Sequence, residues 1–130
     1  MFVMSYDAET DTYLPAEVID VSMYKHKKDI VDLHLSSGEI ITATKSHPFL
    51  TDKGWAAVDP EMSKYDQHYV DPIELHEGDA LVNIDKETVY IEKIVERDEL
   101  WDETVYNCAV EKYNTFIVKG VVVHNAKSAT

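Results

Sequence analysis

Apolar and polar residues alternate throughout residues 31–35 of this 130-residue chain. A period of two is typical of a strand with one buried face. Ser37-Gly38 follows at once and predicts a tight hairpin turn into a second strand over residues 39–44. This part of the chain is therefore expected to be an antiparallel hairpin that lies on a core.

Short segments of the same kind recur along the chain, rich in Val, Ile, Thr and Tyr and separated by turn residues. No segment has the period and length of a long helix, so we predict an all-β domain of nine to eleven short strands. Pro15 is expected to interrupt one strand and suits an edge or a bulge, because proline cannot donate to a strand ladder. The basic cluster at residues 25–28 predicts an exposed turn. The other strands are expected at residues 2–6, 13–25, 80–82, 88–96, 104–111, 115–118 and 120–124.

Residues 59–74 follow neither period. The stretch is polar and contains two prolines, so we interpret it as an inserted loop with one helical turn near residues 61–65. The chain is long enough for one modest core and no more. We therefore expect one domain over residues 1–125, followed by a short tail at residues 126–130.

Twelve basic residues against 25 acidic ones give a net charge of −13. Such a surface repels nucleic acid and anionic membranes and attracts a basic partner. Cys108 is the single cysteine, and no signal peptide or apolar run of membrane-spanning length is visible, which predicts a cytoplasmic protein. The histidines have no metal-ligand spacing, so neither a metal nor another cofactor is expected.

A run of valines near the end of the chain leads into His124-Asn125. An asparagine amide can attack its own main-chain carbonyl, which closes a succinimide and breaks the following peptide bond. A neighbouring histidine can supply the proton for this step near neutral pH. The alternative is a strand that simply runs out into a polar tail.

Four segments, in order, resemble sequence blocks of the Hint fold, which is shared by inteins, bacterial intein-like domains and Hedgehog autoprocessing domains. All four lie within residues 39–125. The resemblance implies a horseshoe-like all-β domain. The segments are TKSHPFLT at 44–51, LHEGDAL at 75–81, VYNCAVE at 105–111 with Asn114 and Phe116, and GVVVHN at 120–125.

The resemblance implies a catalytic role for four residues. Thr44 would hydrogen-bond near the amide at the N-terminal junction, and His47 would protonate its departing nitrogen during an acyl shift. His124 and Asn125 would break the C-terminal junction. The reaction would be autocatalytic, with a single turnover, rather than that of a turnover enzyme.

Three further residues would support these steps. Asn107 stands where many relatives carry an aspartate that helps in proton transfer, and Asn114 stands where some carry a second histidine. Cys108 lies beside them, and its simplest interpretation is a small buried apolar residue rather than a nucleophile.

Two departures from the pattern define the expected activity. The opening block of an intein, with its Cys or Ser nucleophile, is not found at the start of the sequence. The chain therefore resembles the C-terminal fragment of an atypically split intein, although trimming would leave the same sequence. Its partner in trans-splicing would be a basic N-terminal fragment of about 25 residues that supplies the first strands by strand addition, and the flanking extein segments would also take part.

Ala126 stands where splicing needs a Cys, Ser or Thr to accept the acyl group. Either a nucleophile has been replaced and splicing is arrested, or the domain only cleaves, as a bacterial intein-like domain would. The competing hypothesis is a non-catalytic acidic β module that binds a basic peptide. A Hedgehog-like reaction is disfavoured, because that branch does not need a terminal His-Asn.

Overall fold

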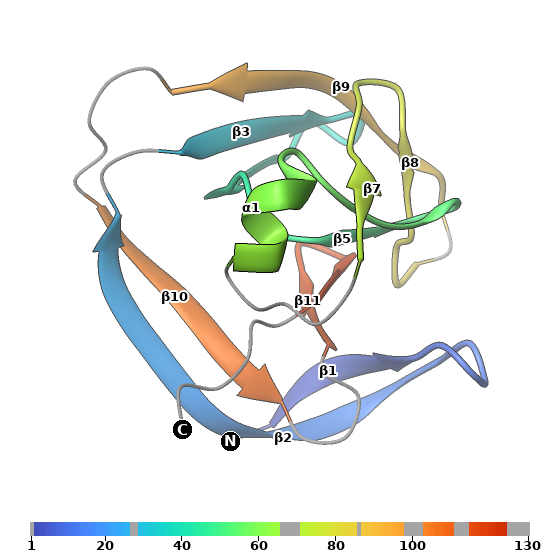
Figure 1. Cartoon of the computed structure of the whole chain (residues 1–130). Coiled ribbons are helices and arrows are strands. Elements are labelled where there is room, and N and C mark those ends of the chain that lie inside the picture. Colours follow the sequence, from blue (N-terminus) through green and yellow to red (C-terminus); the bar gives the residue numbers. More distant parts are fainter. Residues whose placement is uncertain are drawn as a thin grey trace.

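The computed structural model describes residues 2–26, 29–65, 71–85, 87–97, 103–110 and 115–124; for residues 19–26, 65, 103–110, 116 and 124 the description covers the backbone alone. Within these ranges the chain forms twelve strands and one short helix (Figure 1). The prediction of an all-β domain is confirmed. The strands are β1 (Phe2–Asp7), β2 (Thr12–His26), β3 (Ile30–Leu35), β4 (Ile40–Thr44), β5 (Phe49–Thr51), β6 (Gly54–Ala57), β7 (Ile73–Glu74), β8 (Ala80–Leu81), β9 (Val89–Glu96), β10 (Glu103–Val110), β11 (Thr115–Val118) and β12 (Val121–His124), and the helix is α1 (Pro60–Tyr65).

The strands form two sheets. The small sheet has the order β1-β2-β10, and the large sheet follows the path β11-β12-β5-β8-β9-β3-β4, with β6 and β7 attached beside β5. In Figure 1 the long curved ribbon of β2 and β10 and the pair β3 and β9 bound a nearly closed, barrel-like ring. This arrangement brings β1 next to β11, although more than a hundred residues separate them in sequence.

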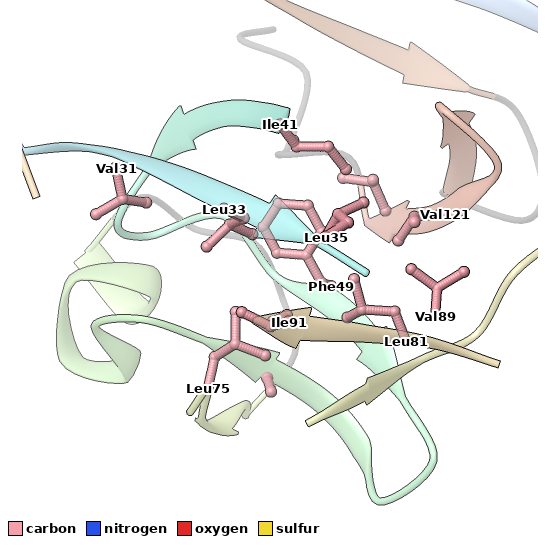
Figure 2. Packing of buried hydrophobic residues seen from close by; sticks show 12 residues of the cluster. Val31, Leu33, Leu35, Ile41, Phe49, Leu75, Leu81, Val89, Ile91 and Val121 are labelled. Atoms are coloured by element: carbon pink, nitrogen blue, oxygen red, sulfur yellow. The ribbon is translucent and has the colours of Figure 1, made fainter. Parts of the chain in front are cut away.

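The core lies inside the large sheet. The alternating residues predicted to face it, Val31, Leu33 and Leu35, are at most 3% exposed. Figure 2 shows Leu33 and Leu35 beside the ring of Phe49 and Val31 farther along the same strand, within one cluster that also contains Ile91. Burial of this apolar cluster is the main force that holds the strands together.

The predicted hairpin at Ser37-Gly38 is confirmed. Gly38 has a φ of 91°, in the left-handed region that glycine adopts readily, and its amide donates to the Leu35 carbonyl at 2.9 Å. Strands β3 and β4 pair on either side of this turn, with Leu33 opposite Ile41.

The prediction around Pro15 is partly right. Strand β2 runs through Pro15 without interruption, so no break occurs there. However, β2 pairs with β1 over residues 12–17 and with β10 over residues 18–26, so Pro15 has a partner strand on one side. Tyr6 directs its amide at Thr115 and not at Tyr13, its partner on β2, so by the alternation of an antiparallel ladder the Met4–Pro15 pair also exchanges no hydrogen bond. The missing N–H group therefore costs no ladder hydrogen bond.

The predicted turn at residues 25–28 is wrong for its first half. Lys25 and His26 continue β2 and lie opposite Thr104 and Glu103 of β10. Pairing with a distant strand overrides the local preference of a charged cluster for a turn. Residues 27 and 28 lie outside the described ranges.

The helical turn predicted near residues 61–65 is confirmed as α1. Asp59 precedes Pro60 and accepts a hydrogen bond from the Met62 amide at 3.1 Å, which is the usual N-terminal cap of a helix. The two-residue strand β7, which pairs in parallel with β6, was not predicted. No helix within the described residues is both long and apolar enough to span a membrane.

Candidate functional site

Strand β12 lies between β11 and β5 and is buried on both faces. Val121, Val122 and Val123 are at most 1% exposed. Since successive side chains of a strand point to opposite faces, this burial means that structure covers both sides of β12. The sequence signal is the unbroken valine run, which is typical of a strand covered on both faces.

A two-residue turn joins β11 to β12. Lys119 and Gly120 both have positive φ, at 50° and 84°, which suits the two-residue hairpins that match the twist of a sheet. On the far side of β12, the Val122 amide donates to the Val82 carbonyl at 3.2 Å and the Ile84 amide donates to the Gly120 carbonyl at 2.7 Å. The start of β12 is therefore held from both sides.

The backbone of His124 ends β12. It lies opposite Thr115 of β11, while Val123 lies opposite Phe49 of β5 on the other side. Asn125 and Ala126 follow directly in sequence and lie outside the described residues. The pair His124-Asn125 therefore follows the buried residues Val121, Val122 and Val123 directly in sequence.

A turn at residues 44–47 carries the second group of predicted site residues. Thr44 ends β4, and the His47 amide donates to its carbonyl at 3.2 Å. The Thr44 Oγ1 lies 3.0 Å from the Oγ of Ser46, which is 1% exposed. The Lys45 amide donates to the Asp29 carbonyl at 2.8 Å, which fixes the start of the turn.

The imidazole of His47 contacts the ring of Phe49. Their centroids are 5.8 Å apart and the rings are tilted by 57°, an arrangement favoured for neighbouring aromatic rings. His47 is partly buried. Pro48 and Phe49, which follow the turn directly, are fully buried and anchor the chain where it enters β5. The orientation of His47 is therefore set by the core rather than by a free loop.

The pairing of β5 with β12 brings the two groups to one end of the large sheet. The strands are antiparallel, and Phe49, the first residue of β5, lies opposite Val123, the last but one of β12. The turn that precedes β5 and the residue that ends β12 therefore lie at the same end. Thr44 and His47 are brought to the end of the sheet from which His124-Asn125 leaves.

The supporting residues lie elsewhere or outside the description. Asn107 and Cys108 are on β10, opposite Ser22 and Val21 of β2 in the small sheet, where the backbone alone is described. Asn114 lies outside the described residues.

Sequence reasoning missed two residues of this site. Ser46 holds the hydroxyl of Thr44, and Phe49 both contacts His47 and aligns β5 with β12. The apolar Pro48-Phe49-Leu50 run after His47 was a signal for a buried strand start, but nothing in it indicated β12 as the neighbour.

Solved structures provide the comparison that identifies the fold. A Ssp DnaB mini-intein variant matches 98% of this chain and 78% of its own at 22% identity, with a TM-score of 0.74. An intein-like domain from Clostridium thermocellum matches 95% and 80% at 25% identity, with a TM-score of 0.70. The PabCDC21-1 intein matches 96% and 70% at 25% identity, with a TM-score of 0.72.

The chain has the Hint fold of inteins. The fold that the four sequence blocks implied is therefore confirmed, although no protein-family model and no curated protein matches the sequence. In this Hint domain the residues of the first and last blocks meet at one end of the large sheet.

Proposed function

We propose that this Hint domain is an autocatalytic protein-splicing domain that cleaves the bond between Asn125 and Ala126. The supporting observation is the pairing of Phe49 with Val123, because it brings the strand entry after His47 next to the strand that leads into Asn125. The names of the matched structures, which describe inteins and an intein-like domain, support the same reaction class.

In the C-terminal step, the Nδ2 atom of Asn125 bonds to the Asn125 carbonyl carbon. The bond from that carbon to the Ala126 nitrogen breaks, and its electron pair stays on the nitrogen. The proton that Nδ2 loses is balanced by the proton that the leaving amine gains, and the His124 imidazole transfers it. The products are a C-terminal succinimide and the peptide 126–130.

In the N-terminal step, the thiol or hydroxyl of an N-terminal segment attacks the carbonyl that precedes it. The carbonyl carbon bonds to the sulfur or oxygen, its bond to the amide nitrogen breaks, and the electron pair of that bond stays on the nitrogen. The proton that the nucleophile loses balances the proton that His47 gives to the nitrogen, while Thr44 donates a hydrogen bond at the amide. Ser46 and Phe49 hold these two side chains in place. Asn107, Cys108 and Asn114 would support the two steps.

Ala126 has no nucleophile to accept an acyl group. Cleavage therefore ends in release rather than ligation. Substitution of Ala126 by Ser or Cys should restore ligation if an arrested splicing domain is the correct description, and should leave release unchanged if the domain only cleaves.

The segment that carries the nucleophile is proposed to pair with β1 as a separate, basic peptide of about 25 residues, which would add strands to the sheet edge. Strand β1 ends the small sheet, and on one face it exposes Phe2 and Met4, at 67% and 39%. Residues 2–18 carry four acidic residues and no basic one. The part of this edge before Ser5, where Phe2 and Met4 lie, is therefore suited to a basic, partly apolar strand.

The decisive experiment follows the intact mass of the purified chain near pH 7, with and without an N-terminal intein peptide. We expect loss of residues 126–130, its abolition by Asn125→Ala, and slowing by about a hundredfold in His124→Ala. His76→Ala is the matched control, because that side chain is 60% exposed and lies outside the site.

Three outcomes would change the proposal. Cleavage without the peptide, and unaffected by it, would favour a self-cleaving intein-like domain over trans-splicing. Binding without cleavage would leave a non-catalytic module. Failure to bind, or binding that does not weaken as salt rises, would contradict the basic partner.

A further inference from the structure

A buried pair of hydroxyl groups joins the two sheets. The Ser5 hydroxyl of β1 donates to the Thr115 carbonyl of β11 at 2.8 Å, and the Oγ atoms of the two residues are also 2.8 Å apart. The Tyr6 amide donates to Thr115 Oγ1 at 2.9 Å. Ser5 is fully buried and Thr115 is 4% exposed.

These hydrogen bonds form one consistent network. The Thr115 hydroxyl donates to the Tyr6 carbonyl, 3.1 Å away, and between the two Oγ atoms either can be the donor. The Thr115 hydroxyl thus both donates and accepts, while the Ser5 hydroxyl donates to the Thr115 carbonyl. A buried network with every group satisfied fixes one arrangement, whereas apolar packing at the same place would allow sliding.

The network compensates for the position of β11 at the end of the large sheet. Its ladder partner is β12, and beyond β11 the strand path of the described residues stops. On that side the contact with β1 through Ser5 and Tyr6 holds it. Thr115, the residue that receives these contacts, lies directly opposite His124.

We propose that Ser5 and Thr115 are positioning residues for the C-terminal cleavage, a role that rests on the proposed function. They fix β11 against β1 and so fix the end of β12, where His124 leads into Asn125. A slip of one residue in this pairing would reverse the face of every side chain on the strand. A peptide that pairs with β1 would therefore affect the position of His124 through Ser5 and Thr115.

The test compares cleavage rates of the whole chain by intact mass. Thr115→Val keeps the shape and removes the hydroxyl, and we expect cleavage to slow by at least about tenfold, because small misplacements of reacting groups cost such factors. Thr115→Ser keeps the hydroxyl and should cleave within about twofold of the unmodified chain. Ser5→Ala should slow cleavage similarly, and the Ser5→Ala/Thr115→Val double variant should be no slower than the worse single variant.

Thr51→Val is the matched control. Thr51 is also 4% exposed, donates to the Gly54 carbonyl at 2.7 Å and accepts from the Lys53 amide at 3.1 Å. A folded Thr115→Val chain that cleaves as fast as the unmodified chain would overturn the proposal. So would equal slowing by Thr115→Val and Thr51→Val, or failure of Thr115→Ser to restore the rate.

Amide hydrogen exchange separates this proposal from the proposed function. If the unmodified chain does not cleave, the proposed function fails. The positioning role is then judged from amide exchange in Ser5→Ala, which removes one hydroxyl group. Exchange about tenfold faster in β11 and β12, with β3 unchanged, would support the role. No change in β11 and β12, or equal acceleration in β3, would overturn it. If Thr115→Val does not fold, the cleavage rate and the amide exchange are both measured on Ser5→Ala and Thr115→Ser.

Discussion

Phe49 lies directly opposite Val123, so the strand that follows His47 begins where the strand that ends in His124 finishes. One pair of residues thus brings the two motifs, about seventy-five positions apart in sequence, to the same end of the sheet. Four properties of this site and of the residues around it can be tested by substitution.

The hydroxyl of Thr44 should matter more than the hydrogen bond it makes within its turn. Thr44→Val is expected to slow the N-terminal step about tenfold, since a donor at the reacting amide is lost, and to leave the release of residues 126–130 unchanged. Ser46→Ala removes the same Thr44–Ser46 hydrogen bond but leaves the Thr44 hydroxyl as a donor, so it should slow the step less than Thr44→Val. Thiol-induced cleavage of a bound N-terminal fragment measures the step. Equal slowing in both variants would mean that Thr44 serves only to hold the turn.

Glycine should be favoured over alanine at position 120, in the turn before β12. Gly120 and Gly38 both have φ near 90°, so alanine at either position is expected to cost about 1 kcal/mol of unfolding free energy. A Cβ at Gly120 would also lie 2.8 Å from Asn83 Nδ2, whereas none of the surrounding atoms lies within 4 Å at Gly38.

Asn83 cannot move away freely, because its Oδ1 accepts from the Asp85 amide at 2.8 Å. Gly120→Ala should therefore cost about 1 kcal/mol more than Gly38→Ala in urea unfolding. In an Asn83→Ala background the difference should disappear. A difference that persists there would assign it to another contact.

Asp32 should be the most costly acidic residue to remove among those discussed. It accepts from Arg97 at 2.8 Å and from the Thr42 hydroxyl at 2.6 Å, and the Arg97 and Asp32 side chains are 27% and 14% exposed. Asp32→Ala leaves a half-buried guanidinium without this carboxylate and should lower the unfolding free energy by about 2 kcal/mol.

Glu61→Ala is the control for Asp32→Ala. Glu61 pairs with Lys64 at 3.5 Å on the surface, with the two side chains 83% and 55% exposed. Such a pair contributes at most about 0.5 kcal/mol. Similar losses in the two variants, measured by denaturant unfolding, would show that burial does not strengthen the Asp32 interaction.

Tyr6 should ionise late. Burial, with a further contribution from the hydrogen bond to Asp11 at 2.8 Å, raises the pKa of Tyr6 from 10.0 to about 12. A raised pKa favours the neutral phenol in the folded state. Its contribution to stability is therefore present below pH 10 and is lost as the pH rises toward about 12.

Asp11→Asn should lower the Tyr6 pKa, because it removes the negative charge while asparagine still tolerates the φ of 51° at this position. The ultraviolet absorbance of tyrosinate reports the titration. Tyr13, whose pKa burial also raises, titrates nearby. Because the chain has eight tyrosines, the Tyr6 signal is the difference between titrations of chains with and without Tyr6→Phe. An unchanged Tyr6 pKa in Asp11→Asn would exclude Asp11 as a cause and leave burial as the main one, with Tyr13 and Asp7.

Local patterns predicted the parts of the fold that depend on neighbouring residues. The alternation over residues 31–35 and the Ser37-Gly38 turn predicted the β3–β4 hairpin, and the polar, proline-containing stretch at 59–74 predicted the helical turn that is α1. Long-range pairing was out of reach. Lys25 and His26 belong to β2 because β10 lies beside them, and no local feature of either segment indicates this pairing.

The same limit applies to the candidate site. Ser5 and Thr115 are separated by 110 positions, and each hydroxyl alone looks like an ordinary polar residue of a strand. Their roles become visible when the two sheets are brought together. The chemistry stays a prediction from residue types and from the resemblance, whereas the alignment of Phe49 with Val123 required the structure.

The burial of β12 determines what remains once the reaction is over. The valines that bury this strand all precede His124, and the ladder pairs described for β12 with β11 and β5 involve no residue after His124. The spent domain should stay folded and keep its hold on any peptide bound at β1. Each molecule would then act as a stoichiometric reagent, and accumulated product would compete with fresh domain for the peptide.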